Sequence, residues 1–260
     1  MATAAPAPGI GIGPAPLPLR SVCVFLGSAD GTGDAYRAAA TATGRLLASQ
    51  GLDVVYGGAG IGCMGALADG ALAAGGRVIG VLPKMLSDRE IGHRYGLRRP
   101  PAGAQHPGRP AARSPTRRRP PRRRPLAERR GLTALHMVGT MHERKTKMAE
   151  LADAFLALPG GLGTLEEVFE VLTWSHLGVH RKPCCFVNVD GYFDQLIAFL
   201  DHAVAHGFLR PAVRALCMVA PTPEAALAQL QAAVARGGVA ESGTLASMDL
   251  PRPGLSMEQT

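Results

Sequence analysis

Short apolar runs alternate with amphipathic stretches along most of the chain. Apolar runs at 22–26, 53–56 and 78–82 are separated by a helical pattern over 34–50 and by an Ala-rich stretch that ends near Gly75. Such alternation of strand and helix signals builds parallel sheets that helices cover on both faces. The pattern therefore predicts a single α/β domain with a Rossmann-like, doubly wound parallel sheet.

The second half of the chain repeats this pattern. The expected strands are 134–138, 154–158, 184–189 and 216–219, and the expected helices are 141–151, 165–177, 192–206 and 223–236. Since consecutive strands are usually neighbours, strands 134–138 and 154–158 are expected side by side. The helices that follow them would then begin at the same sheet edge, where open α/β sheets bind ligands.

The positive charge is concentrated in one low-complexity segment. Residues 94–130 hold thirteen Arg, one Glu and eight Pro, so they contribute +12 to a net charge of +8 and leave −4 for the rest. Pro combined with like charge prevents collapse onto a core. We expect 95–129 to be a disordered insertion in a domain spanning 21–236, flanked by a flexible leader (1–20) and tail (237–260).

Nucleic acid is not the favoured partner, because a basic binding face should be structured and carry polar or aromatic side chains among its charges. Residues 94–130 contain one aromatic residue, Tyr95. An interaction arm remains the alternative interpretation. If the segment is only an insertion, deleting 95–129 should leave both fold and activity intact.

The remaining composition indicates a cytoplasmic protein without a membrane partner. No apolar stretch reaches the roughly 20 residues that span a bilayer. The five cysteines are odd in number and mostly in apolar surroundings, which is typical of buried thiols in a reducing compartment. His176 and His180 have helical spacing, but Gly178 and Val179 indicate that the helix is ending, so no metal site is expected.

The motif Pro-Gly-Gly-Leu-Gly-Thr-Leu-Glu-Glu at 159–167 carries the strongest chemical signal. It follows an apolar run and opens a helix, where free backbone N–H groups and the helix dipole favour a phosphate. Glycine permits close approach of the ligand. We therefore expect Gly160, Gly161, Gly163 and Thr164 to form a phosphate cup.

Carboxylates and cations accompany this cup. Glu166 and Glu167 lie in the first helical turn, close to the expected phosphate, where like charge is costly without a cation. Arg144, in the segment 141–148, can supply that cation.

Two further glycine-rich turns follow the first two strands. Gly60, Gly62 and Gly65 match a dinucleotide fingerprint, which alone is a weak signal. The acid expected at the end of the next strand is missing, because that strand runs into Pro83 and Lys84. A nicotinamide cofactor is therefore not expected. The turn 27–30 ends the first strand and adds a third loop to the same edge.

Together these motifs resemble the Lonely Guy family of cytokinin-activating phosphoribohydrolases. The resemblance covers about 21–94 and 131–234 and implies a Rossmann-like homodimer. It also implies hydrolysis of cytokinin riboside 5′-monophosphates, and in some members AMP, to the free base and ribose 5-phosphate, without metal or organic cofactor. It implies catalytic roles for Arg144 and Glu167. The expected substrate-binding residues are Ser28, Gly58, Gly60, Met141, Lys145, Gly160, Gly161, Gly163, Thr164 and Glu166.

Two departures from the family pattern concern this site. Ala29 stands where the family usually has a second serine. The Arg/Pro segment is inserted directly after Glu90, Ile91 and His93, a stretch that itself resembles the family's sequence. The alternative function is a nucleotide-binding or molybdenum-cofactor carrier of the same fold that keeps the phosphate cup without hydrolysis. A pyridoxal-dependent decarboxylase is disfavoured because no lysine lies in a plausible Schiff-base setting.

Overall fold

The computed structural model describes residues 18–84 and 132–239. The predicted insertion 95–129 lies outside these ranges, as do most of the predicted leader and tail. Within them, no helix is both long enough and apolar enough to cross a membrane.

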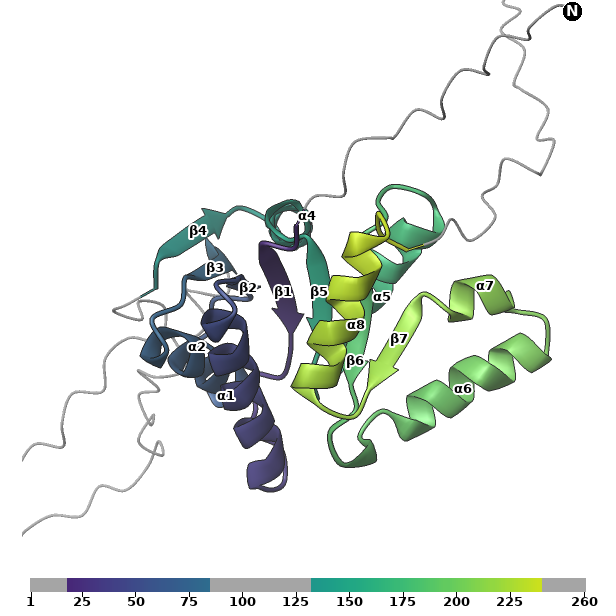
Figure 1. Cartoon of the computed structure of the whole chain (residues 1–260), viewed down its shortest axis with the longest axis horizontal. Coiled ribbons are helices and arrows are strands. Elements are labelled where there is room, and N and C mark those ends of the chain that lie inside the picture. Colours follow the sequence, from purple (N-terminus) through teal and green to yellow (C-terminus); the bar gives the residue numbers. More distant parts are fainter. Residues whose placement is uncertain (1–17, 85–131, 240–260) are drawn as a thin grey trace, which may run out of the picture.

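Seven parallel strands form one sheet in the described part of the chain, in the order β4-β3-β2-β1-β5-β6-β7 (Figure 1). This confirms the predicted fold class. The strands are β1 (Ser21–Phe25), β2 (Asp53–Tyr56), β3 (Val78–Pro83), β4 (Ala134–Val138), β5 (Ala154–Ala157), β6 (Cys184–Val187) and β7 (Cys217–Ala220).

The helices agree with the predicted ranges to within about three residues at each end. They are α1 (Asp34–Ser49), α2 (Gly62–Ala73), α4 (Met141–Leu151), α5 (Leu162–His176), α6 (Asp194–Ala205), α7 (Pro211–Arg214) and α8 (Pro223–Ala235). The short helix α7 and a 3₁₀ turn at Val189–Gly191 were not predicted, because elements this short show no apolar periodicity.

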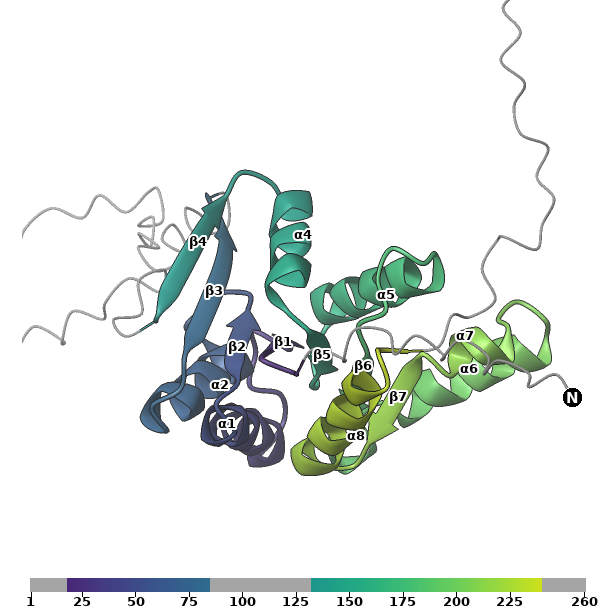
Figure 2. The same cartoon turned by 45° about the horizontal axis from the view of Figure 1, so that its top comes forward.

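Both faces of the sheet are buried. In β1, Val22 and Val24 pack into one hydrophobic core, while Cys23 and Phe25 pack into the other, as the two-residue period of a strand requires. Figure 2 shows α1, α2 and α8 on one side of the sheet and α4 and α5 on the other. The five cysteines are all buried, as their apolar surroundings predicted.

The prediction that strands 134–138 and 154–158 are neighbours is wrong. β4 is an edge strand that pairs with β3, whereas β5 pairs with β1 in the register Val22↔Ala154. From β1 to β4 the chain adds each strand outward, and it then returns to the free side of β1. This reversal is a topological switch point, where doubly wound sheets bind ligands.

Helix α4 makes the return and crosses one face of the sheet, in contact with β1, β2, β3 and β4. Its start is fixed by a variant of the capping box: the Thr140 hydroxyl accepts from the Glu143 N–H at 3.1 Å, and the Glu143 carboxylate accepts from the N–H of Gly139, the residue before the cap, at 2.8 Å. Arg144 therefore occupies a defined place one turn into the helix.

Candidate active site

Backbone hydrogen bonds join three turns at the carboxyl ends of the central strands. The Gly27 N–H donates to Pro159 O at 3.1 Å, which joins the turn after β1 to the turn after β5. The Met64 N–H donates to Gly27 O at 3.2 Å and brings in the start of α2. The three loops predicted to converge therefore do meet, and their backbone forms the frame of the site.

Arg144 is buried at the centre of this frame, with 5% of its surface exposed. Its Nε donates to Val81 O of β3 at 3.1 Å, and its Nη1 donates to Glu167 Oε1. A Cβ at Gly57 would overlap the guanidinium. The guanidinium is thus held by a strand carbonyl, a carboxylate and a glycine that leaves room for it.

Glu167 is equally buried and projects from the second turn of α5. The prediction that Glu166 and Glu167 lie in the first turn is wrong, because the helix begins three residues earlier, at Leu162. Burial raises the pKa of its carboxyl, and the adjacent Arg144 charge and hydrogen bond oppose that rise. Although their helices follow strands that are far apart in the sheet, the guanidinium and the carboxylate are in direct contact. The structure therefore brings together the two residues predicted to be catalytic.

Helix α5 begins without a side-chain cap, as do α1, α2, α6 and α7, whereas α4 and α8 begin at capping threonines. The N–H groups of a helix's first turn have no intrahelical acceptor, so an uncapped start can receive an anion. Thr164 is buried in this turn, and a Cβ at Gly160 would overlap its Oγ1. The predicted phosphate cup thus has an open helix end and a tightly packed base.

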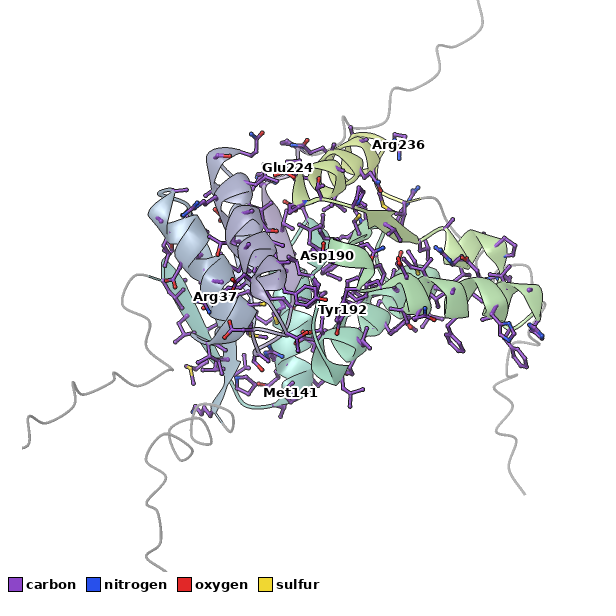
Figure 3. All side chains as sticks on the ribbon, turned by 90° about the horizontal axis from the view of Figure 1, so that it is seen from below. Arg37, Met141, Asp190, Tyr192, Glu224 and Arg236 are labelled. Carbon is purple, nitrogen blue, oxygen red and sulfur yellow. The ribbon has the colours of Figure 1, made fainter. Side chains whose placement is uncertain are left out.

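A cleft of about 430 Å³ lies against this turn and against the Arg144–Glu167 pair. Seven of the predicted site residues line it: Ser28, Met141, Arg144, Gly161, Gly163, Thr164 and Glu167. Figure 3 shows Met141 of α4 on the same face of the molecule as Tyr192. A cleft of this size can hold a mononucleotide, which needs a few hundred Å³.

Gly160 lies on the other side of the glycine turn. It lines an adjoining hollow of about 400 Å³, together with Ser28, Tyr36 and Tyr192. The Tyr192 hydroxyl donates to Gly160 O at 2.7 Å, and its ring packs edge-on against Tyr36. Tyr192 therefore supports the cup from outside the cleft.

The other four predicted substrate-binding residues do not line the cleft. Gly58 has a positive φ of 81°, and a Cβ there would press against Leu82 at 3.2 Å, so glycine is required for the turn after β2. Gly60 lies in the same turn. Lys145 forms ion pairs with Glu166 and Glu170 of α5. A substrate-binding role for Gly58, Gly60, Lys145 and Glu166 stays a prediction.

Sequence reasoning missed several residues that line the cleft: Leu26, Gly27, Gly57, Ala59, Met64, Leu82 and Leu162. Most are apolar, and an apolar residue at the end of a strand or the start of a helix gives no signal distinct from core packing. Gly57 could have been found, because it is the first residue after β2 and so lies at the ligand-binding edge.

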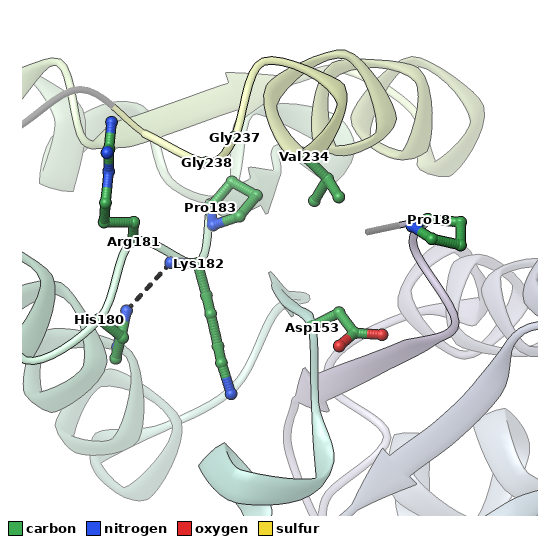
Figure 4. A pocket seen from close by; sticks show the side chains of 9 residues that line it. All are labelled: Pro18, Asp153, His180, Arg181, Lys182, Pro183, Val234, Gly237 and Gly238. Atoms are coloured by element: carbon green, nitrogen blue, oxygen red, sulfur yellow. Dashed lines mark hydrogen bonds between the residues drawn. The ribbon is translucent and has the colours of Figure 1, made fainter. Parts of the chain in front are cut away.

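A third hollow, of about 290 Å³, lies at the amino ends of the strands, opposite the candidate site (Figure 4). Asp153 and Pro183, at the amino ends of β5 and β6, line it with His180 and Lys182. The Lys182 ammonium donates to Ala149 O at 2.7 Å, and burial lowers the pKa of His180 to about 4. These groups lie away from the strand ends that carry the Arg144–Glu167 pair.

In the described ranges, no group of three or more His, Cys, Asp or Glu side chains is placed to hold a metal ion.

Comparisons with known proteins identify the family. A family model described as possible lysine decarboxylase matches residues 64–230, and one described as SLOG cluster4 matches 20–97. A protein of Rhodococcoides fascians named cytokinin riboside 5′-monophosphate phosphoribohydrolase is 42% identical over 212 residues, covering 82% of this chain and 89% of that protein. The chain belongs to this phosphoribohydrolase family.

Plant members of the phosphoribohydrolase family are nearly as similar. The rice protein named LOG is 38% identical and covers 82% of this chain and 73% of that protein. The Arabidopsis thaliana protein named LOG3 is also 38% identical, with 82% of each chain covered. The resemblance to the Lonely Guy family that the motifs predicted is thereby confirmed.

Among solved structures, the molybdenum cofactor carrier protein of Chlamydomonas reinhardtii matches with a TM-score of 0.52 and 20% identity, covering 82% of this chain and 97% of that one. The molybdenum cofactor binding protein of Rippkaea orientalis matches with a TM-score of 0.51 and 18% identity, covering 82% and 96%. At this identity the likeness concerns the fold alone.

Proposed function

We propose that this protein hydrolyses the N-glycosidic bond of cytokinin riboside 5′-monophosphates to the free base and ribose 5-phosphate, and so activates cytokinins. One observation carries the proposal beyond family membership: Arg144 and Glu167 form a buried ion pair in a cleft that opens onto an uncapped helix start.

The 5′-phosphate is placed at the start of α5. Backbone N–H groups of the first turn and the Thr164 hydroxyl would bind its oxygens, and the helix dipole would favour its charge. Binding the phosphate here fixes the distance of the sugar from Glu167, which lies one helical turn further on. Energy from this remote contact would thus orient the anomeric carbon for reaction.

Glu167 is assigned the role facing the sugar. As the bond from the anomeric carbon to the base nitrogen breaks, positive charge develops on the ring, and a buried carboxylate stabilises it. The same carboxylate can orient a water for attack. Water supplies the hydroxyl on the anomeric carbon, its remaining proton ends on the departing base, and the bond's electron pair leaves with the base.

Arg144 is assigned the role of keeping Glu167 ionised and in place. A buried carboxylate is disfavoured in its charged form, and an adjacent cation offsets that cost. Because its Nε is held by Val81 O, the guanidinium approaches Glu167 from a fixed direction. Arg144 also lines the cleft and can contact the substrate directly.

The test is release of free base from isopentenyladenosine 5′-monophosphate and from AMP by the purified chain. Glu167→Gln keeps the shape but removes the charge, and we expect it to lower kcat by about 100-fold or more, a size typical of such groups. Glu224→Gln is the control, since Glu224 is a helical glutamate that is exposed on α8.

Near-normal turnover by a folded Glu167→Gln variant would contradict the assignment. If this chain were instead a carrier of the same fold, the wild-type protein would bind the nucleotide and release no base. The fold-level likeness to molybdenum cofactor carriers gives that alternative no support at the level of the site.

A homodimer in the cytoplasm is part of the proposal. Buried free thiols suit a reducing compartment. Several large apolar side chains are exposed near the end of α5 and on or after α6, among them Val179, Phe199 and Phe208, and such side chains favour association. Light scattering after size exclusion should then give twice the chain mass of 27.0 kDa; a monomer at micromolar concentration would contradict it.

A further inference from the structure

Two adjacent residues of α4 contact two adjacent residues of α5. Arg144 pairs with Glu167 inside the cleft, and Lys145 pairs with Glu166 outside it. Lys145 also reaches Glu170 at 3.0 Å, one helical turn beyond Glu166 on the same side of α5. The ammonium thus bridges two carboxylates of α5 directly beside the candidate catalytic pair.

The Lys145–Glu170 half of this bridge is sheltered from solvent, whereas the Glu166 side chain is 53% exposed. The side chains of Lys145 and Glu170 are 14% and 20% exposed, whereas ordinary surface pairs such as Lys147–Glu150 are 39% and 58% exposed. Burial by itself would lower the pKa of Lys145, but hydrogen bonds and the charges of Glu166 and Glu170 raise it above its ordinary value. Lys145 therefore stays charged at neutral pH.

The topology indicates why this bridge matters for the site. Helix α4 follows the edge strand β4, and α5 follows β5, with β3, β2 and β1 between them. Strand pairing therefore does not align the two helices directly. Yet Arg144 must meet Glu167 within hydrogen-bonding distance, and a displacement of about 1 Å can cost about 100-fold in rate.

We infer that Lys145, held by Glu170 and Glu166, is a positioning residue that aligns α4 with α5 and thereby sets the Arg144–Glu167 contact. This inference rests on the proposed hydrolysis and replaces the substrate-binding role that the motif predicts for Lys145. The two roles differ in what they do to catalysis. A substrate-binding lysine mainly changes KM, whereas a positioning lysine mainly changes kcat.

The experiment measures kcat and KM with isopentenyladenosine 5′-monophosphate for Lys145→Met, Lys145→Arg and Glu170→Gln. We expect Lys145→Met to lower kcat about 10-fold or more with KM changed by less than about 3-fold. Lys145→Arg should recover most of the rate. Glu170 does not line the cleft, yet Glu170→Gln should lower kcat in the same way. The variant that combines Lys145→Met with Glu170→Gln should have a kcat no lower than that of Lys145→Met alone.

Lys147→Met is the matched control, because its ion pair lies within α4 and is exposed; its kcat should be unchanged. If Lys145→Met raised KM alone and the Glu170→Gln variant had normal kinetics, the inference would be overturned. Lys145 would then be assigned to substrate binding. Wild-type turnover tests the proposed function separately. Independently of turnover, a crystal structure of Lys145→Met should show Arg144 Nη1 separated from Glu167 Oε1, and a retained contact would overturn the inference.

Discussion

At the residue scale, the site depends on two opposite charges buried together. Taking either one out of water is costly, and removing one partner leaves the other uncompensated. Arg144 and Glu167 are each 5% exposed, so the charge state of each depends strongly on the other. Because burial raises the pKa of Glu167, its ionised form exists at neutral pH with the support of Arg144.

This coupling predicts a pH effect. In the proposed mechanism the reaction needs ionised Glu167, so kcat/KM should fall as the pH drops through the raised pKa of that carboxyl, above the roughly 4.3 of an exposed glutamate. Arg144→Ala removes the charge that lowers this pKa, so its acidic limb should lie at higher pH, besides a loss of about 100-fold or more in kcat.

The measurement is the pH profile of kcat/KM for both enzymes on one substrate, so that titration of the substrate's phosphate affects both equally. A variant limb at the same pH as wild type, or below it, would disprove the coupling.

At the element scale, function depends on how α5 begins. Helix α5 has no side-chain cap, a feature it shares with α1, α2, α6 and α7, and its first turn lines the cleft. The glycines of this turn are not equivalent. A Cβ at Gly160 would overlap Thr164 Oγ1 and approach Gly27 N to 2.8 Å, whereas a Cβ at Gly161 would meet no atom within 4 Å.

Alanine substitutions at these two glycines should therefore have different effects. Gly160→Ala should lower the free energy of unfolding by about 1–3 kcal/mol, as overpacking does, and should also lower activity. Gly161→Ala should leave stability unchanged within about 0.5 kcal/mol and raise KM if a phosphate approaches this backbone. Urea unfolding and steady-state kinetics check both. Equal stability of the two variants would show that the turn relaxes freely.

At the scale of the whole molecule, the site exists because the chain reverses its winding between β4 and β5. The carboxyl end of β3 and the amino end of β4 are joined through residues 84–133, most of which lie outside the described ranges. β3 and β4 are parallel neighbours, with Ile79 opposite Ala134.

Deletion of 95–129 tests whether the Arg/Pro segment contributes to the fold or to the active site. The shortened connection would keep about fifteen residues, enough for a parallel crossover, which needs about a dozen. We expect thermal unfolding and turnover of the deletion variant to match the full chain. Loss of both would show that the segment belongs to the domain, and steeply salt-dependent nucleic-acid binding that disappears with it would show an interaction arm.

The sequence determined the elements and most of the chemistry. Apolar periodicity located all seven strands and the longer helices because it reflects local geometry. The motif 159–167 pointed to Gly161 and Thr164 because a glycine-rich helix start favours an anion. The choice of Glu167 over Glu166 came from the family resemblance.

Only the tertiary structure decided what these parts do together. Strand order is set by how the crossovers pack, so the sequence wrongly placed β5 beside β4. The same packing carries α4 across the sheet, which puts Arg144 in the cleft and directs the next residue, Lys145, to Glu170 instead. The side chains of consecutive helical residues point about 100° apart. Only the packing against the partner helix determines which of them faces the cleft.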